Sequence, residues 1–110
     1  MDIDTYKTLA MRTAKLFPTA CENLVHAALG ATSECGELST TVKAHVVYGT
    51  PIDGENVKEE IGDAMWYLAL AAKSIGLTLS QCAKANIEKL ERRYPEKYTD
   101  QDAVRRADKL

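Results

Sequence analysis

The chain has 110 residues, 45% of them hydrophobic and 27% charged, and its 14 basic and 16 acidic side chains give a net charge of −2. These values are close to the globular average and exclude disordered, collagen-like and low-complexity proteins, while the small net charge without a basic run argues against a nucleic-acid partner. No stretch reaches the roughly 18 uncharged apolar residues of a membrane span, and the start of the chain (Met1, Asp2, Ile3, Asp4) is acidic where a signal peptide is basic, so we expect no membrane partner and a cytoplasmic location.

The hydrophobic period breaks at prolines and glycines, and these breaks divide the chain into about four helices. The pattern predicts an all-α, four-helix-bundle-like single domain over residues 1–110, with its core at about 20–95. Thr19 and Glu22 can form a capping box at the start of a long helix, and Gly49 and Gly76 stand where helices end in left-handed geometry. The predicted helices cover residues 4–16, 19–48, 53–75 and 78–94, and residues 98–110 form a short helix or a tail.

Two of these helices carry acidic residues where an apolar face is expected. At about 100° per residue, Glu60 falls inside the apolar arc of the third helix and Asp63 lies at its edge, while Glu34 abuts the arc of the second helix and Glu37 lies one step further out. The arc of the third helix consists of Val57, Ile61, Ala64, Leu68, Ala71, Ala72 and Ile75. The arc of the second consists of Leu24, Ala28, Ala31, Cys35, Leu38 and Val42. Ionised carboxylates are rarely buried without a partner, so these acids need one.

The turn between the two helices predicts that the four acids meet. In an antiparallel hairpin with its turn at Tyr48 and Gly49, Glu34 lies level with Asp63, and Glu37 lies level with Glu60. Any one pair could simply salt-bridge to lysines or lay its aliphatic stem over the core, but four carboxylates in a partly dry groove require a cation. An all-oxygen site favours Mg²⁺, with Mn²⁺ as a substitute, over zinc or di-iron, and Mg²⁺ completes its shell with substrate phosphates. The expected substrate is a polyphosphate.

Other residues are placed to contact such a substrate. Asn86, Lys89 and Arg93 share one side of the fourth helix, where a cation could neutralise phosphate charge, although a solvated helix face explains Lys89 equally well. Tyr67 lies in the apolar arc one turn beyond Asp63. His26 lies two turns before Glu34, within reach of a bound nucleotide, and a packed core histidine is the alternative.

Trp66 falls opposite the apolar arc of the third helix. A tryptophan on that side would be exposed in a monomer. Since aromatic residues are enriched at protein interfaces, we expect Trp66 to be an interface residue rather than a platform for a base.

The motif Glu34-Cys35-Gly36-Glu37 followed by Glu60-Ile61-Gly62-Asp63 resembles the E-x-x-E…E-x-x-D signature of MazG-like, all-α nucleoside triphosphate pyrophosphohydrolases. The similarity covers roughly residues 20–100. It includes four further segments, which are His26–Gly30, Tyr48–Pro51, Glu59–Tyr67 and Asn86–Pro95.

The resemblance implies an enzyme that cleaves an NTP or dNTP to the monophosphate and pyrophosphate, with Mg²⁺ held by Glu34, Glu37, Glu60 and Asp63, and that cleanses or rebalances nucleotide pools. It also implies a helical fold whose site is completed by dimerisation, in a dimer or a tetramer. Many members of the family carry a further glutamate where this chain has Ser33. Glu37 or Glu34 is therefore expected to hold the attacking water as the catalytic residue.

Two alternatives remain at this stage. The chain could be a non-catalytic helical dimer with a structural metal site, which would lose much of its stability when the metal is removed. It could also be a specialised relative that acts on phosphoribosyl-ATP, which a panel of substrates would reveal.

Overall fold

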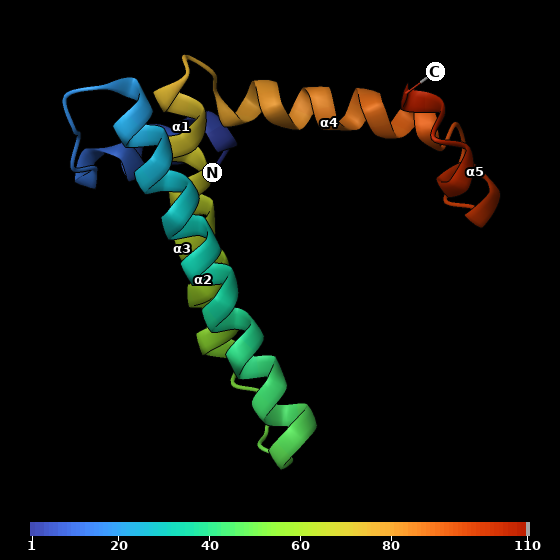
Figure 1. The fold of residues 1–110 in the computed structure, drawn as a ribbon, viewed down its shortest axis with the longest axis horizontal. Helices are drawn as coiled ribbons and strands as arrows, with labels where there is room; N and C mark the ends of the chain where they lie inside the picture. The colour runs from blue at the N-terminus through green and yellow to red at the C-terminus, as the bar shows by residue number, and fades with distance from the viewer. Residues whose placement is uncertain (110) are drawn as a thin grey trace. The chain divides into compact units, whose positions relative to one another are not determined.

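The computed structural model describes residues 1–109, and all their regular structure is helical (Figure 1). The all-α fold class is therefore confirmed. No helix among these residues has the length and apolar character of a membrane span. The last residue of the predicted segment 98–110, Leu110, lies outside the described part. The elements are α1 (Ile3–Ala10), the 3-10 helix η1 (Met11–Thr13), α2 (Ala20–Tyr48), α3 (Gly54–Ser74), α4 (Leu79–Arg93), α5 (Asp100–Arg105) and the 3-10 helix η2 (Ala107–Lys109).

The chain forms two compact units, Met1–Leu79 and Ser80–Leu110. The first contains α1, η1, α2 and α3, and the second contains most of α4 together with α5 and η2. Within the second unit, the Arg93 guanidinium donates a hydrogen bond to the Ala103 carbonyl (3.1 Å) and so ties the end of α4 to α5. The single domain over residues 1–110 stays a prediction.

The ends of α2 and α3 lie where the turn residues predicted them. The Thr19 hydroxyl accepts from the Glu22 amide (3.1 Å) and caps α2. The Asp53 carboxylate accepts from the two amides that follow Gly54 and caps α3. Gly49 and Gly76 have φ values of 71° and 76°, a left-handed conformation that glycine adopts without steric cost.

Helices α2 and α3 lie side by side and antiparallel (Figure 1), and side-chain contacts define their register. The Asn56 amide donates to the Thr41 hydroxyl (2.8 Å), which places these residues level with one another. Further from the turn, the Tyr67 ring lies directly against Gly30. The residue numbers of both pairs add to the same total as those of Glu34 and Asp63, so the predicted register of the hairpin is confirmed.

The predicted apolar arcs are partly wrong. The residues of the first unit that are actually buried are Ala27, Glu60, Ala69, Leu70 and Ala72. In contrast, Ala28, Cys35 and Val42 of the predicted α2 arc are exposed, and so are Ile61, Leu68 and Ile75 of the α3 arc. The reason is that α3 packs against α1 and η1 as well as against α2, so its buried surface includes Ala69 and Leu70, whereas part of its apolar surface faces outwards.

The N-terminal segment also differs from its prediction, because α1 ends at Ala10 rather than near residue 16. The indole Nε1 of Trp66 donates to the Ala10 carbonyl (2.9 Å), and the Thr13 hydroxyl donates to the same oxygen (2.9 Å). These bonds occupy a carbonyl that a continuing helix would use, and the chain passes into η1. Trp66 is consequently half-buried by α1 and η1, so the expectation that it is exposed in the monomer is wrong, whereas its role at an interface stays a prediction.

The contact between Gly30 and Tyr67 predicts an effect on stability. A Cβ at residue 30 would overlap the Tyr67 ring, so Gly30→Ala forces the ring or the helix to move. We expect the variant to lose about 1–3 kcal/mol of unfolding free energy, as overpacked sites do. Chemical denaturation followed by circular dichroism measures this loss.

Gly36→Ala is the matched control, because a Cβ there meets nothing within 4 Å and alanine favours the helix. We expect this variant to be unchanged or more stable by up to about 1 kcal/mol. If both variants had the same stability, the contact between Gly30 and Tyr67 would have no energetic weight.

Candidate metal centre and adjoining cavity

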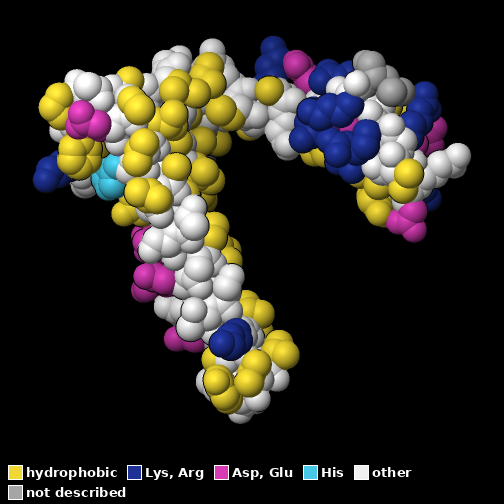
Figure 2. Space-filling model, viewed as in Figure 1, with side chains coloured by type: hydrophobic (Ala, Val, Ile, Leu, Met, Phe, Trp, Pro, Cys, Tyr) yellow, Lys and Arg dark blue, Asp and Glu magenta, His cyan; other side chains and the backbone are white. Residues whose placement is uncertain are grey.

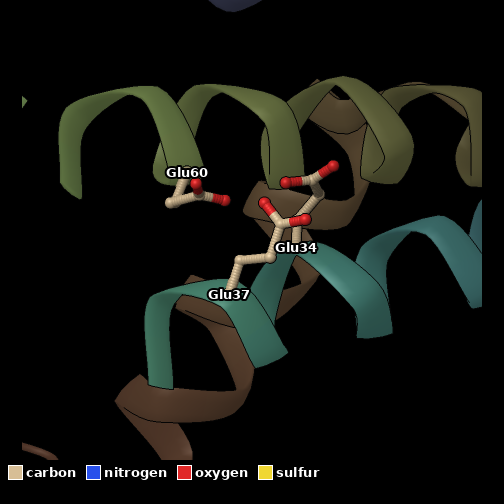
Figure 3. Close-up of side chains that lie close together, drawn as sticks. All are labelled: Glu34, Glu37 and Glu60. Carbon is tan, nitrogen blue, oxygen red and sulfur yellow. The ribbon is translucent and has the colours of Figure 1, made fainter. Parts of the chain in front are cut away.

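Three glutamates converge between α2 and α3 (Figure 3). Glu34 and Glu37 extend from adjacent turns of α2 toward α3, and Glu60 enters the same space from α3. One carboxylate oxygen from each residue lies within 4.8 Å of those of the other two. The spacing of three residues within α2 and the register of the hairpin together produce this cluster.

The cluster is buried enough to be electrostatically unfavourable on its own. The Glu60 residue is only 8% exposed, and one oxygen of Glu34 and one of Glu60 (both Oε2) are buried without a hydrogen-bond partner. Burial, reinforced by the Glu34 and Glu37 carboxyls, raises the pKa of Glu60 from 4.5 to about 7. The Glu60 carboxyl thus titrates near neutrality, because its ionised form is buried beside two other carboxyls.

In the part of the chain that the structure describes, no basic side chain forms an ion pair with these carboxylates. Among residues 1–109, the ion pairs join Lys58 to Glu55 and Arg106 to Asp108, and neither includes a member of the cluster. The buried, unpartnered oxygens of Glu34 and Glu60, with the exposed Glu37 carboxylate beside them, fit a divalent cation. Since all the donors are oxygens and no histidine or cysteine belongs to the group, the donor set suits Mg²⁺ or Mn²⁺ better than zinc.

A cavity of about 420 Å³ adjoins the cluster. Its lining residues are Thr13, Glu34, Asp63, Trp66 and Tyr67. Asp63 is thus close to Glu34, as the register predicts, but it is not one of the three acids whose oxygens lie within 4.8 Å of one another. Its role as a fourth ligand stays a prediction.

One wall of the cavity comes from the N-terminal segment, which sequence reasoning did not assign to the site. Thr13 lines the cavity, and its hydroxyl accepts a hydrogen bond from the Trp66 indole (3.1 Å). Tyr6 of α1 donates to the Gly62 carbonyl (3.5 Å), and burial together with the charge of Asp63 raises the pKa of its hydroxyl. The sequence contains no signal for Thr13, because a lone threonine inside a predicted helix looks like an ordinary helix residue.

Tyr67 and His26 lie next to each other but face different cavities. Tyr67 lines the cavity with Glu34 and Asp63. His26 packs edge-to-face between Tyr67 (5.8 Å between ring centroids) and Phe17 (5.4 Å), with its Nδ1 buried and unpartnered. It lines a separate, mostly apolar cavity of about 440 Å³. The structure therefore brings Tyr67, but not His26, to the cavity beside the acids.

The predicted phosphate-binding residues of α4 belong to the second unit. Asn86 is exposed, and Lys89 and Arg93 are half-buried. The Arg93 side chain bonds to Ala103 within its own unit and lies over the Tyr94 ring at 5.2 Å. The roles predicted for these three residues stay predictions.

Comparisons with known proteins agree with this geometry. Residues 24–98 match the MazG nucleotide pyrophosphohydrolase domain. The chain is 31% identical over 104 residues to a protein of Mycobacterium phage L5 called "Gene 37 protein", in an alignment that covers 84% of this chain and 89% of that protein. No solved structure matches the chain significantly.

The raised pKa of Glu60 predicts how stability depends on pH in the metal-free protein. Between pH 4.5 and about 7, the folded chain holds a proton on Glu60 that the unfolded chain releases. The stabilisation that this proton gives the folded chain is complete at low pH. It is lost as the pH rises through the pKa that Glu60 has in the folded state. In EDTA, we therefore expect the unfolding free energy to fall from about pH 5 to about pH 8, and to fall less in Glu60→Gln.

Urea denaturation at the lower and the higher pH measures the fall in unfolding free energy for the original chain and for Glu60→Gln. Glu59→Gln serves as the control, because Glu59 is the exposed neighbour of Glu60 on the same helix. If Glu60→Gln and Glu59→Gln showed the same pH dependence as the original chain, Glu60 would not be the titrating group.

Proposed function

Because this chain belongs to the MazG nucleotide pyrophosphohydrolase family, we propose that it is a Mg²⁺-dependent enzyme that converts nucleoside triphosphates or deoxynucleoside triphosphates to the monophosphate and pyrophosphate. Such an enzyme cleanses or rebalances nucleotide pools. The observation that carries the proposal is the cluster of Glu34, Glu37 and Glu60, whose oxygens have no cationic partner and which adjoins a cavity.

The four acids would hold the metal: Glu34, Glu37 and Glu60 from the cluster, and Asp63 from the cavity wall. When bound, Mg²⁺ polarises phosphoryl oxygens, lowers the pKa of bound water and stabilises a pyrophosphate leaving group. The protein contributes position, because α2 and α3 are packed in one register and bring three of these carboxylates, those of Glu34, Glu37 and Glu60, close together.

The residue that accepts the proton of the attacking water is proposed to be Glu34 or Glu37. Ser33 replaces the additional glutamate of many relatives, and a neutral hydroxyl is a poor base at neutral pH. Glu34 is favoured for two reasons. It lines the cavity, and its buried Oε2 has no hydrogen-bond partner, so this atom is free to accept a proton.

The remaining predicted contacts differ in how well the geometry supports them. Tyr67 lies in the cavity wall, where its ring can contact the nucleotide. His26 is separated from that cavity by Tyr67 and acts by supporting the Tyr67 ring. Asn86, Lys89 and Arg93 are proposed to contact phosphates, because amide and cationic side chains stabilise phosphate charge.

Exposed apolar residues support the proposal of a homo-oligomer, either a dimer or a tetramer. Hydrophobic side chains gather on the surface of the hairpin (Figure 2). On α3, Ile61, Met65 and Leu68 follow one another at helical spacing and are 50%, 39% and 51% exposed. Contiguous exposed apolar side chains at this spacing are typical of a protein-protein interface. A second copy of the chain would cover them.

The proposed activity predicts a sharp effect of Glu60→Gln. This substitution keeps the size of the side chain and removes one anionic oxygen ligand, so we expect pyrophosphate release from a mixture of dNTPs with Mg²⁺ to fall at least about 100-fold. Metal-free Glu60→Gln should remain folded, as measured by circular dichroism. Coupled detection of pyrophosphate and chromatography of the nucleotide products measure the activity.

The exposed Glu59 gives the control, since Glu59→Gln changes the same charge one residue away and should retain activity. Release of single phosphates, or an unchanged rate in Glu60→Gln, would contradict the proposed reaction. A large loss of thermal stability in EDTA together with no activity would instead support a structural metal site.

The proposed oligomer predicts the effect of a charge on α3. Leu68→Glu would place one carboxylate per subunit in the interface, and twofold symmetry doubles its cost. We expect the dissociation constant of the oligomer to rise at least about 100-fold, as measured by sedimentation velocity. Lys73→Glu, at an exposed residue in the last turn of α3, is the control. A monomeric original chain would contradict the proposal directly.

A further inference from the structure

The cavity beside the acids contains a residue that neither the acid motif nor the predicted substrate contacts include. We propose that Thr13 is a specificity-determining residue, whose hydroxyl accepts a hydrogen bond from the nucleoside part of the substrate. The ligand chemistry is an N–H or O–H donor, which is either an exocyclic amino group of the base or a hydroxyl of the sugar. This inference rests on the proposed function.

The composition of the cavity wall separates a phosphate end from a nucleoside end. Glu34 and Asp63 are the anionic part of the lining and belong to the proposed metal-binding acids. The rest of the lining is the Thr13 hydroxyl and two aromatic side chains with a polar group each, the Trp66 indole and the Tyr67 phenol. No lysine or arginine is among the residues that line the cavity, so this part has no cation to neutralise a phosphate, whereas aromatic rings with a few polar groups are typical of a nucleoside subsite.

The hydrogen bonds of Thr13 determine what its hydroxyl can recognise. Its proton is used, because Oγ1 donates to the Ala10 carbonyl (2.9 Å). One of its two lone pairs accepts from the Trp66 indole (3.1 Å). One lone pair remains, and it can only accept. A nucleoside that presents a donor there gains a hydrogen bond, and one that presents a carbonyl oxygen does not.

The wall is held in place, so the hydroxyl is pre-positioned. The Trp66 indole bonds both Ala10 and Thr13. Tyr6 anchors α1 to the Gly62 carbonyl, one residue before Asp63. At the far end of the segment, the Asn23 side chain bonds the amide (2.7 Å) and the carbonyl (3.3 Å) of Phe17. A fixed acceptor discriminates between ligands better than a mobile one, because it cannot move to accommodate the wrong group.

The test compares three variants of the full chain. Thr13→Val keeps the shape and removes the hydroxyl, while Trp66 retains its bond to Ala10 and so continues to hold the wall. Thr13→Ser restores the hydroxyl. Thr8→Val is the matched control, because Thr8 is exposed on α1 and its hydroxyl bonds only the Asp4 carbonyl (3.1 Å).

The measured quantity is kcat/KM for pairs of substrates that differ in the donors they present: CTP has an amino group where UTP has a carbonyl oxygen and a neighbouring N3–H, and CTP has a 2′-hydroxyl that dCTP lacks. CTP against UTP tests the amino group, and CTP against dCTP tests the sugar hydroxyl. We expect Thr13→Val to reduce the preference in one pair by about 3- to 10-fold, as the loss of one neutral hydrogen bond does, through KM rather than kcat. Thr13→Ser and Thr8→Val should retain the preference. Ratios that stay within about 2-fold of the original chain in both pairs would overturn the inference.

A binding measurement separates this inference from the proposed function. Trp66 is the single tryptophan of the chain, so its fluorescence reports directly on the cavity. CMP with Mg²⁺ should quench or shift this emission, and Thr13→Val should weaken CMP binding about 3- to 10-fold. If CMP changes the Trp66 emission but the protein releases no pyrophosphate from nucleotides, the proposed function is overturned and the role of the cavity is not. Release of pyrophosphate with emission unaffected by CMP would overturn the role of the cavity.

Discussion

The repulsion among three closely spaced carboxylates is the constraint on which this structure depends. Glu34, Glu37 and Glu60 have oxygens within 4.8 Å of one another, and Glu60 is almost fully buried. Left ionised and unpartnered, they would separate the two helices that carry them. The hairpin tolerates them because its register is secured on both sides, by the contact of Gly30 with Tyr67 and by the hydrogen bond of Asn56 with Thr41. The proposed cation would convert this unfavourable cluster into a binding site.

Sequence reasoning predicted this hairpin because its information is local. Thr19, Gly49 and Asp53 mark helix ends through their own chemistry, and a turn placed between Tyr48 and Gly49 determines which residues lie level. The same reasoning failed where tertiary contacts compete with periodicity. The end of α1 depends on an indole 56 residues away, and no pattern in the first helix reports it. Periodicity also cannot tell which of two apolar surfaces on α3 is covered within the chain and which faces outwards.

The site residues also divide into those that a local sequence pattern identifies and those that only tertiary contacts reveal. The acids were identifiable because a charged residue inside an apolar arc contradicts its surroundings, and such contradictions are where function is expected. Thr13 and Trp66 contradict nothing locally, so only the folded chain reveals that they border the cavity. Gly30 is an intermediate case, since a glycine inside a long helix often has a packing reason, but the Tyr67 ring that explains it lies on another helix.

The spacing of these contacts along the chain has a consequence for the order of folding. The acids lie within residues 34–63 of one helical hairpin, whereas the bond between Trp66 and Thr13 joins residues 53 positions apart. Closing a longer loop costs more chain entropy, and local contacts form earlier. We therefore expect the hairpin that carries the carboxylates to form before the N-terminal segment docks. A cation encountered at that stage would find its ligands already assembled, and the segment that carries Thr13 would close over them as a separate, later event.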